Sequence, residues 1–404
     1  MNSMYAIEGK KILITGGTGF IGGRLVEILK TRYNVDVRVL VSTYANVSRI
    51  ARFSIDIFKG DLCSREDVHN AVEGCDMVFH CAYGNKGSQE DKRKVNVEGT
   101  RNVLAACRDH DIQRLVHLST IMVYGHTRDG ILDENAPRAG TGGTYSDTKL
   151  EAEKLVMDYY KNEGVPATIL QPTAVYGPYA PVWGVNVLAQ LKTGTTVLIN
   201  NGEGLCNCVY IDDLINAMLL AAVHDDAPGE SFIISGDEPV TWREFYGHFE
   251  RMLGYDCTIG MSEADAIAYM TRLQTRKSLI RTLGEDAEFR ARLLETPMFS
   301  NMAKAANRFL PEKALQSIKQ KVKKNGNGKA KKEPSSNGQA NHRPVHPMSD
   351  DQIRFFAAKT RFSIDKAKSV LGYKPQYDIS TGMNITEKWS EAANLLGRMA
   401  QVAG

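Results

Sequence analysis

The feature that most constrains this 404-residue chain is a regular alternation of short β-branched runs with helical stretches over residues 11–171. Apolar runs of three to five residues separated by helices are typical of right-handed βαβ units, whose parallel sheet is covered by helices on both faces. We predict strands at 12–14, 37–41, 55–58, 77–79, 115–118 and 168–170. Six strands of this kind fit a doubly wound nucleotide-binding sheet.

A glycine-rich turn directly follows the first of these strands. Gly16, Gly19 and Gly22 are three residues apart, and a helix begins near Phe20. The first glycine permits the tight turn, the second lets the backbone approach a pyrophosphate, and the third allows the helix to pack close to the sheet. The free N–H groups of the helix N-terminus would bind the anion. The turn therefore predicts a dinucleotide site; the alternative is a structural turn without a ligand.

The identity of the dinucleotide depends on the end of the second strand. Residues 42–44 are Ser-Thr-Tyr, without the acid that NAD-binding proteins usually place there. Arg49 and Arg52 follow and could bind the 2′-phosphate of NADP, or they could be solvated loop charges. The cofactor is thus NAD or NADP, and this pattern favours NADP. Asp61, after the third strand, is placed either to meet the adenine or to cap a helix.

A hydroxyl, a phenol and an amine follow in an order that suggests redox chemistry. Thr120 ends the fifth strand, and Tyr145 and Lys149 are one helical turn apart. A phenol with a pKa near ~10 is a weak base at neutral pH, but a nearby ammonium and an oxidised nicotinamide would lower that pKa. Tyr145 could then exchange a proton with a substrate hydroxyl or carbonyl held by Thr120 while a hydride moves. The alternative is a surface pair, because Tyr-x-x-x-Lys arises by chance in many helices.

These pieces together resemble the extended short-chain dehydrogenases/reductases of the NAD-dependent epimerase/dehydratase family. The resemblance covers residues 11 to about 253 and resumes over 362–389. Its motifs are those at 15–22, 60–62, 78–82, 96–100, 118–125, 145–149, 172–178, 209–213 and 364–375. It implies an α/β fold: a Rossmann-type doubly wound parallel sheet (1–172), completed by later strands, with a smaller mixed α/β substrate part (173–257 and 351–404).

The resemblance also implies the roles of particular residues. Thr120, Tyr145 and Lys149 match the catalytic positions. His80 matches a structural histidine at a strand end. The positions that match cofactor contacts are Gly16, Gly19, Phe20, Ile21, Gly22, Asp61, Leu62, Ala82, Tyr145, Lys149 and Pro172. A homodimer is common in the family and is expected on that ground.

Departures from the family pattern bear on the substrate. Sugar-nucleotide dehydratases carry an Asp-Glu pair after the catalytic threonine, where this chain has Ile121 and Met122, so dehydration is disfavoured. The arginines that many nucleotide-sugar enzymes carry correspond here to Gln171 and to Asn207 or Cys208, which weakens the case for a diphosphate clamp.

Three hypotheses about function remain. The first is an NAD(P)-dependent epimerase or oxidoreductase of a nucleotide-linked sugar, which the overall motif set favours. The alternative is an NADP-dependent reductase or dehydrogenase of a larger apolar alcohol or ketone, similar to hydroxysteroid dehydrogenases, which the missing arginines favour. A non-catalytic dinucleotide-binding protein is disfavoured, because such proteins typically lack the tyrosine.

Residues 258–350 have no counterpart in the resemblance. We predict a helical insertion over 258–324, a basic disordered linker over 325–350 and order from Phe362 onward. The insertion as a whole could be a lid that covers the site or an ordinary helical subdomain. Residues 298–324, which interleave apolar residues with lysine and arginine, could instead lie on an anionic membrane.

Composition restricts the class of protein further. The chain is 43% hydrophobic and 24% charged, with a net charge of +3, and seven lysines gather between Lys319 and Lys332. We expect no nucleic-acid partner, because without those seven lysines the chain has a net charge of about −4 (3 − 7), which is not the basic folded face that such binding needs. The seven scattered cysteines suggest reduced thiols and no metal site. A cytoplasmic protein without a signal or membrane-spanning segment is expected.

Overall fold

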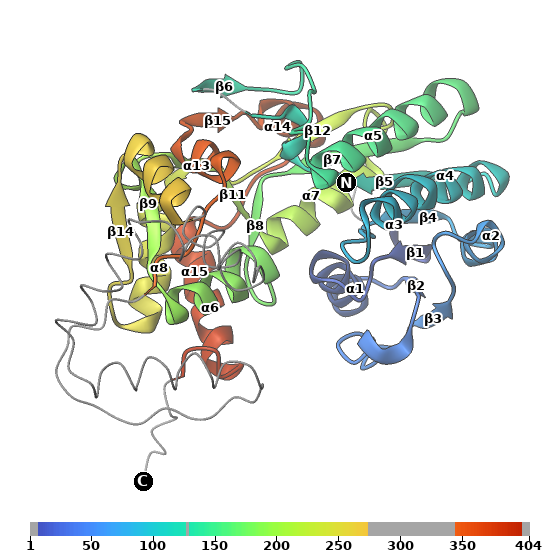
Figure 1. Cartoon of the computed structure of the whole chain (residues 1–404). Helices are drawn as coiled ribbons and strands as arrows, with labels where there is room; N and C mark the ends of the chain where they lie inside the picture. The colour runs from blue at the N-terminus through green and yellow to red at the C-terminus, as the bar shows by residue number, and fades with distance from the viewer. Residues whose placement is uncertain (1–6, 127–128, 274–343, 398–404) are drawn as a thin grey trace, which may run out of the picture. The chain divides into compact units, whose positions relative to one another are not determined.

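The computed structural model describes residues 7–126, 129–273 and 344–397. Its main feature is a seven-stranded parallel sheet with the strand order β12-β7-β5-β4-β1-β2-β3 (Figure 1). The strands are β1 (Lys11–Thr15), β2 (Asp36–Val41), β3 (Asp56–Lys59), β4 (Met77–His80), β5 (Arg114–Leu118), β7 (Ala167–Pro172) and β12 (Ser231–Ile234). All six predicted strands are present, and β12, from the second half of the chain, completes the sheet beside β7.

Helices cover both faces of this sheet. One face packs on α1 (Phe20–Arg32) and α7 (Ile211–Val223), and the other on α2 (Arg65–Val72), α4 (Gly99–Asp109) and α5 (Thr144–Glu163). Within β1, Ile12 and Ile14 are buried on the first face and Leu13 on the second, each without exposed surface. A strand with both faces buried explains the unbroken apolar runs. The predicted α/β, Rossmann-type fold is confirmed.

The sheet has its crossover point between β1 and β4. From β1 the chain continues outward to β2 and β3 and then returns to β4 on the other side of β1. In doubly wound sheets ligands bind outside the carboxyl ends of the strands at such a point. The glycine turn after β1, the loop after β4 and Thr120 after β5 all lie at this edge.

The remaining elements form the smaller mixed part. They are β6 (Gly130–Leu132), β8 (Ala174–Tyr176), α6 (Asn186–Thr193), β9 (Thr196–Ile199), β10 (Leu205–Cys206), β11 (Cys208–Tyr210), β13 (Val240–Thr241), α8 (Trp242–Leu253), β14 (Thr258–Met261), α13 (Asp350–Ala357), β15 (Thr360–Phe362), α14 (Asp365–Leu371) and α15 (Ile379–Ala392). Short turns of helix lie between them, and a short helix α3 (Gln89–Arg93) precedes α4. Aromatic rings fix α13 here, with Phe356 4.6 Å from Trp242 between ring centroids.

Two predictions about the ends of the insertion differ from the structure. Residues 258–261, expected to start a helical insertion, form β14 and pair in parallel with β9. Order also begins before Phe362, since α13 starts after Ser349, inside the predicted linker. Ser349 and Gln352 form a capping box, whose Ser-x-x-Gln spacing is a recognisable helix start.

The described residues fall into two compact units. The first contains 7–263 and 348–397, and the second contains 264–273 and 344–347. The predicted boundary after residue 172 lies inside the first unit. Most of the predicted insertion and linker, including the segment 298–324, lies outside the described residues.

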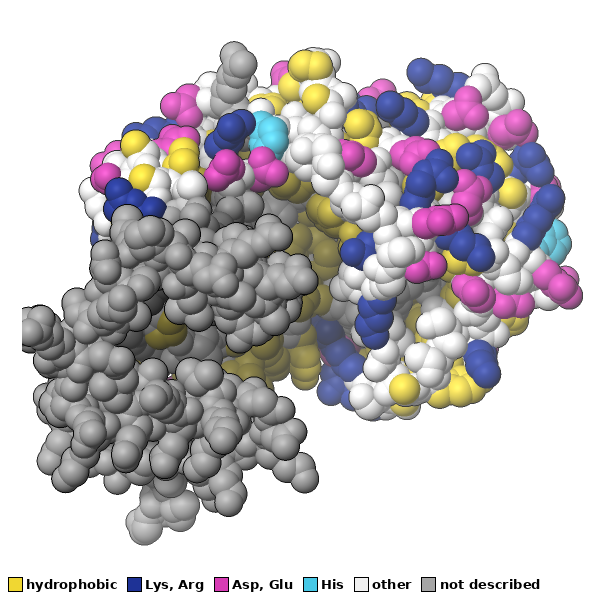
Figure 2. All heavy atoms as spheres, in the orientation of Figure 1, with side chains coloured by type: hydrophobic (Ala, Val, Ile, Leu, Met, Phe, Trp, Pro, Cys, Tyr) yellow, Lys and Arg dark blue, Asp and Glu magenta, His cyan; other side chains and the backbone are white. Residues whose placement is uncertain are grey.

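The described surface has mixed charge on the face that Figure 2 displays, where basic and acidic side chains alternate. The expected absence of a nucleic-acid partner stays a prediction. No helix in the described ranges is long and apolar enough to cross a membrane. The homodimer and the cytoplasmic location stay predictions.

Candidate active site

The glycine turn has the geometry of a pyrophosphate cradle. Gly16 has a φ of +72°, and a Cβ there would lie 2.7 Å from the backbone nitrogen of Ala82. A Cβ on Gly22 would overlap the carbonyl of Gly16. Gly19 is the N-cap of α1 and has no side chain that could accept a hydrogen bond, so the N–H groups of the first helical turn remain available to a ligand at the helix N-terminus. The residues at this turn therefore fit a dinucleotide phosphate.

The other predicted cofactor contacts lie on neighbouring elements. Phe20 and Ile21 start α1, and Pro172 is buried at the end of β7. Ala82 follows β4 and donates its N–H to the hydroxyl of Thr15 over 3.3 Å. All of these positions lie at the carboxyl edge of the sheet.

Asp61 and Leu62 lie further out along the same edge, after β3. The Asp61 carboxylate is exposed and accepts from the N–H of Cys63 at 2.9 Å. It does not cap α2, because Ser64 does so by accepting from Asp67. This outcome removes the helix-cap alternative and leaves Asp61 accessible to a ligand.

His80, at the end of β4, uses both ring nitrogens inside the fold. Its Nδ1 lies 2.6 Å from the Thr15 hydroxyl, and its Nε2 lies 2.9 Å from that of Thr100. Burial lowers its pKa to about 3, so the ring is neutral. A histidine held in this way is structural.

The structure places Thr120, Tyr145 and Lys149 close together. Tyr145 and Lys149 lie in the first turns of α5, and Thr120 follows β5. Lys149 is 6% exposed and donates from Nζ to the Leu118 carbonyl at 2.7 Å. Tyr145 remains 40% exposed, so its phenol can be reached by a small molecule.

Burial shifts the pKa values of Tyr145 and Lys149 in opposite directions. Partial burial raises the pKa of Tyr145, and a hydrogen bond with Thr120 acts in the opposite direction. Burial lowers the pKa of Lys149 to about 8, although Cys81 and Glu153 act to raise it. In the protein alone the net effect on the Tyr145 phenol is a raised pKa, so the lowering expected from the ammonium and the oxidised nicotinamide stays a prediction for the complex with the cofactor.

The two arginines considered for NADP are both bound to Glu27. Arg49 donates to the Glu27 carboxylate at 2.9 and 3.0 Å, and its guanidinium stacks 4.2 Å from the ring centroid of Tyr179. Arg52 donates to the same carboxylate at 2.8 Å, but its side chain is 60% exposed. Of the two, only Arg52 retains an accessible face for a phosphate.

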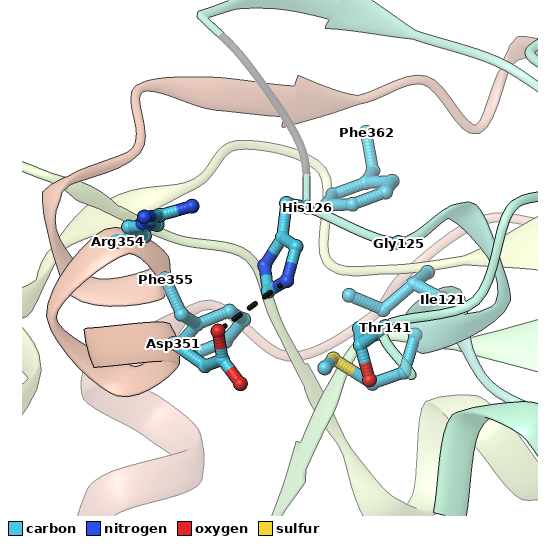
Figure 3. A pocket seen from close by; sticks show the side chains of 9 residues that line it. Ile121, Gly125, His126, Thr141, Asp351, Arg354, Phe355 and Phe362 are labelled. Atoms are coloured by element: carbon cyan, nitrogen blue, oxygen red, sulfur yellow. Dashed lines mark ion pairs between the residues drawn. The ribbon is translucent and has the colours of Figure 1, made fainter. Parts of the chain in front are cut away.

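A pocket opens at Ile121 and Met122, the two residues that follow Thr120 in the chain (Figure 3). It encloses about 70 Å³. Its lining residues are Ile121, Met122, Gly125, His126, Thr141, Asp351, Arg354, Phe355 and Phe362. Figure 3 shows His126 between Phe355 and Phe362, facing Asp351 at 3.4 Å. The walls are therefore mainly apolar, with Asp351 and Arg354 from α13 and the imidazole of His126 at one side.

The two positions that lack arginine have other partners. Gln171 is fully buried and donates to the Glu153 carboxylate at 2.9 Å. Asn207 donates to the Thr360 carbonyl at 2.7 Å and accepts from the N–H of Phe362 at 3.0 Å, and so it fixes β15 beside the pocket. Both side chains are buried and use their amides for hydrogen bonds within the fold.

Sequence reasoning missed several residues of this region. Arg138 lies 3.3 Å from Glu153 and supplies the buried carboxylate with a cation. His126, Asp351 and Phe355 line the pocket, and no motif marked them. Tyr83 contacts both members of the Tyr145–Lys149 pair. In the described part of the chain no cluster of His, Cys, Asp or Glu is arranged to hold a metal ion.

Comparison with known proteins gives a family and a set of relatives. The family model described as "NAD dependent epimerase/dehydratase family" matches residues 12–235. A sterol-4-alpha-carboxylate 3-dehydrogenase (decarboxylating) of Candida albicans is 27% identical over 94% of this chain and 97% of its own length. A 2-alkyl-3-oxoalkanoate reductase of Stenotrophomonas maltophilia is 31% identical over 74% of this chain and 93% of its own.

Solved structures share the fold across nearly the whole chain. An epimerase from Methanothermobacter thermautotrophicus has a TM-score of 0.68 and 18% identity, covering 98% of this chain and 97% of its own. The UDP-glucuronic acid 4-epimerase of Bacillus cereus, in complex with NAD, has a TM-score of 0.63 and 19% identity, covering 95% and 99%. At such identities the likeness supports the architecture alone.

Proposed function

Because this chain belongs to the NAD dependent epimerase/dehydratase family, we propose that it is an NAD(P)-dependent dehydrogenase or ketoreductase of a secondary alcohol or ketone on a largely apolar molecule. Membership agrees with the predicted enzyme class and nicotinamide cofactor. The nucleotide-linked sugar, which the motif set favoured, takes second place.

The cofactor would be held at the carboxyl edge of the sheet, by the glycine turn, Asp61, Leu62 and Ala82. When bound, a nicotinamide dinucleotide supplies or accepts the hydride. Thr120 would hold the substrate oxygen, and Tyr145 would take the hydroxyl proton during oxidation or return it during reduction. Lys149 would stabilise the phenolate and hold the nicotinamide ribose. Since the phenol pKa is raised in the protein alone, its lowering would depend on the positive charges of Lys149 and of the oxidised cofactor together.

The observation that carries the substrate class is the pocket at the two residues after Thr120. Ile121 and Met122 line it where the sugar-nucleotide dehydratases have an acid pair, and the rings of Phe355 and Phe362 face them. Apolar walls would bind the body of a hydrophobic substrate by excluding water. The hydroxyl-rich ring of a sugar would find few partners on those walls, which supports the apolar reading.

Charged groups at one side of the pocket refine the proposal. Arg354 lines the pocket from α13, near His126. The two relatives described above, each matched over more than nine-tenths of its own length, act by their names on a sterol carboxylate and on an oxoalkanoate. A carboxylate next to the reacting carbon could pair with Arg354 through charge-assisted hydrogen bonds.

The test measures turnover of a panel of substrates, with the absorbance of the reduced dinucleotide as the readout. A 3-hydroxysterol, a carboxylated sterol, a 2-alkyl-3-oxo acid and UDP-glucose represent the competing classes. We expect activity with the apolar compounds, lost in Tyr145→Phe while dinucleotide affinity remains. Turnover of UDP-glucose alone would reverse the order of the two hypotheses, and a fully active Tyr145→Phe would refute the mechanism.

A second measurement addresses how the cofactor is used. Mass spectrometry of the dinucleotide released on denaturing the purified protein distinguishes a tightly held cofactor from an exchanging one. A net dehydrogenase or reductase must exchange its cofactor after each turnover, so we expect an empty or weakly loaded site. Stoichiometric NAD would instead favour an epimerase, which regenerates its cofactor within each cycle.

A further inference from the structure

Tyr83, in the loop after β4, contacts both groups of the proposed acid–base pair. Its ring meets that of Tyr145 edge to face, with the centroids 5.0 Å apart and the planes at 86°. The Nζ of Lys149 lies 5.6 Å from the centroid of the same ring. Edge-to-face pairs and cation–π contacts are favourable at these distances. One aromatic ring therefore touches the phenol and the ammonium at once.

The backbone on both sides of Tyr83 is held in place. On one side, Ala82 donates to Thr15. On the other, Asn96 accepts from the N–H of Gly84 at 2.7 Å and donates to its carbonyl at 3.0 Å. Asn96 is 5% exposed and lies in a π-helical turn, Lys94–Glu98, a local geometry that is frequent at functional sites. The backbone that carries the Tyr83 side chain is thus held on both sides.

We propose that Tyr83 is a positioning residue, whose ring holds the Lys149 ammonium and the Tyr145 phenol in the relative arrangement that stabilises the phenolate. The inference rests on the proposed acid–base role of Tyr145 and Lys149. The ring, and not the hydroxyl, carries the effect, because both contacts are made through the aromatic system. Without the ring the ammonium would be less constrained and the phenolate less stabilised.

The other titratable groups around the pair do not share this role. Burial keeps the thiol and both imidazoles neutral, since it raises the pKa of Cys81 to about 12 and lowers the pKa values of His80 and His117. Glu153, on the same helix, is paired with Arg138. Lys149 is therefore the charge whose placement Tyr83 can change.

The experiment measures the ionisation of Tyr145 and needs no substrate. Phenolate absorbance is titrated in the presence of saturating NAD, and each protein is compared with its own Tyr145→Phe counterpart, so that the difference isolates one phenol. The proteins are the parent, Tyr83→Phe, Tyr83→Leu and Tyr83→Met. A cation–π contact changes an equilibrium by about two- to fivefold when exposed and about thirtyfold when desolvated. We therefore expect the Leu and Met variants to raise the Tyr145 pKa by about half a unit or more, and Tyr83→Phe to match the parent.

Several outcomes would overturn the proposal. One is a Tyr145 pKa unchanged in both the Leu and the Met variant. Another is a shift in Tyr83→Phe as large as in Tyr83→Leu, which would assign the effect to the hydroxyl. Loss of the fold in both apolar variants, seen by circular dichroism, would show that the ring is structural. Failure of the proposed enzyme function would be detected in a different experiment, the turnover assay, as full activity of Tyr145→Phe.

Discussion

Replacing Lys149 by methionine should stabilise the protein without its cofactor near neutral pH, because this lysine is buried at a cost to the fold. Burial lowers its pKa from 10.5 to about 8. One pKa unit corresponds to about 1.4 kcal/mol, so the shift corresponds to about 3 kcal/mol. The side chain is 6% exposed, and solvent therefore screens little of this penalty. The Leu118 carbonyl would lose its partner in the variant, which leaves an expected gain of about 2 kcal/mol.

The pH dependence gives this prediction its sign. Below pH 8 the folded and unfolded chains both hold the proton, and the folded chain carries the whole penalty of a buried ammonium. Between pH 8 and 10.5 the unfolded chain binds the proton more strongly, so the stability of the parent protein rises with pH. Above this interval both states are neutral and the penalty is gone. The difference between parent and Lys149→Met should therefore shrink as the pH rises through the interval.

Urea unfolding of the dinucleotide-free proteins measures the effect at neutral and alkaline pH. The dinucleotide must be absent, because a ligand of the folded state would add its own stabilisation. Lys154→Met is the matched control, since Lys154 is exposed on the same helix and should change stability by less than about 0.5 kcal/mol. Equal stabilities of Lys149→Met and parent near neutral pH, or a difference that stays constant with pH, would refute the argument.

Three further substitutions test the cofactor and substrate sides of the site. Gly16→Ala should weaken dinucleotide binding, measured by calorimetry, at least about tenfold, because the new Cβ would lie 2.7 Å from backbone atoms. Gly9→Ala is the control for backbone strain alone, because Gly9 has a similar φ of +70° but no atom within 4 Å of the new Cβ. Arg52→Ala should weaken NADP binding by about fivefold and leave NAD binding unchanged if its exposed guanidinium meets the 2′-phosphate; equal effects on both would remove the preference for NADP. Asn207→Ala should raise KM more than it lowers kcat, because it frees β15 beside the pocket; unchanged steady-state constants would detach that strand from substrate binding.

Local patterns were sufficient for the cofactor half of the molecule. The strands 12–14 and 115–118 are recognisable because both faces of a parallel strand are buried, which leaves an unbroken apolar run. The glycine spacing follows from conformational rules that act within a few residues, and the helix expected to hold Tyr145 and Lys149 is present as α5. The seventh strand, Ser231–Ile234, could be noted as a short strand, but its pairing with β7 depends on residues about sixty positions away.

The substrate half depended on contacts between segments that are distant in sequence. Phe362 reaches the pocket from β15, where Asn207, 155 residues earlier, holds its backbone. Arg49, a candidate for NADP, is paired with Glu27 on another element, and no local pattern reveals that pairing. Such partners decide whether a charge faces a ligand or the protein, and so the sequence alone left the substrate class open.

Helix α5 shows how the proposed proton transfer can be kept separate from the choice of substrate. Tyr145, Lys149 and Glu153 follow at four-residue intervals on one face, a face that an ordinary surface helix would fill with apolar residues. Each buried charge has a partner from another element: the Leu118 carbonyl for Lys149, and Arg138 for Glu153. These partners belong to the fold and not to the pocket. Residues of the pocket walls, which begin at Ile121, could therefore be exchanged, and the substrate with them, without disturbing the proposed acid–base pair. For this reason we infer the chemistry from Tyr145 and Lys149 and the substrate class from the walls.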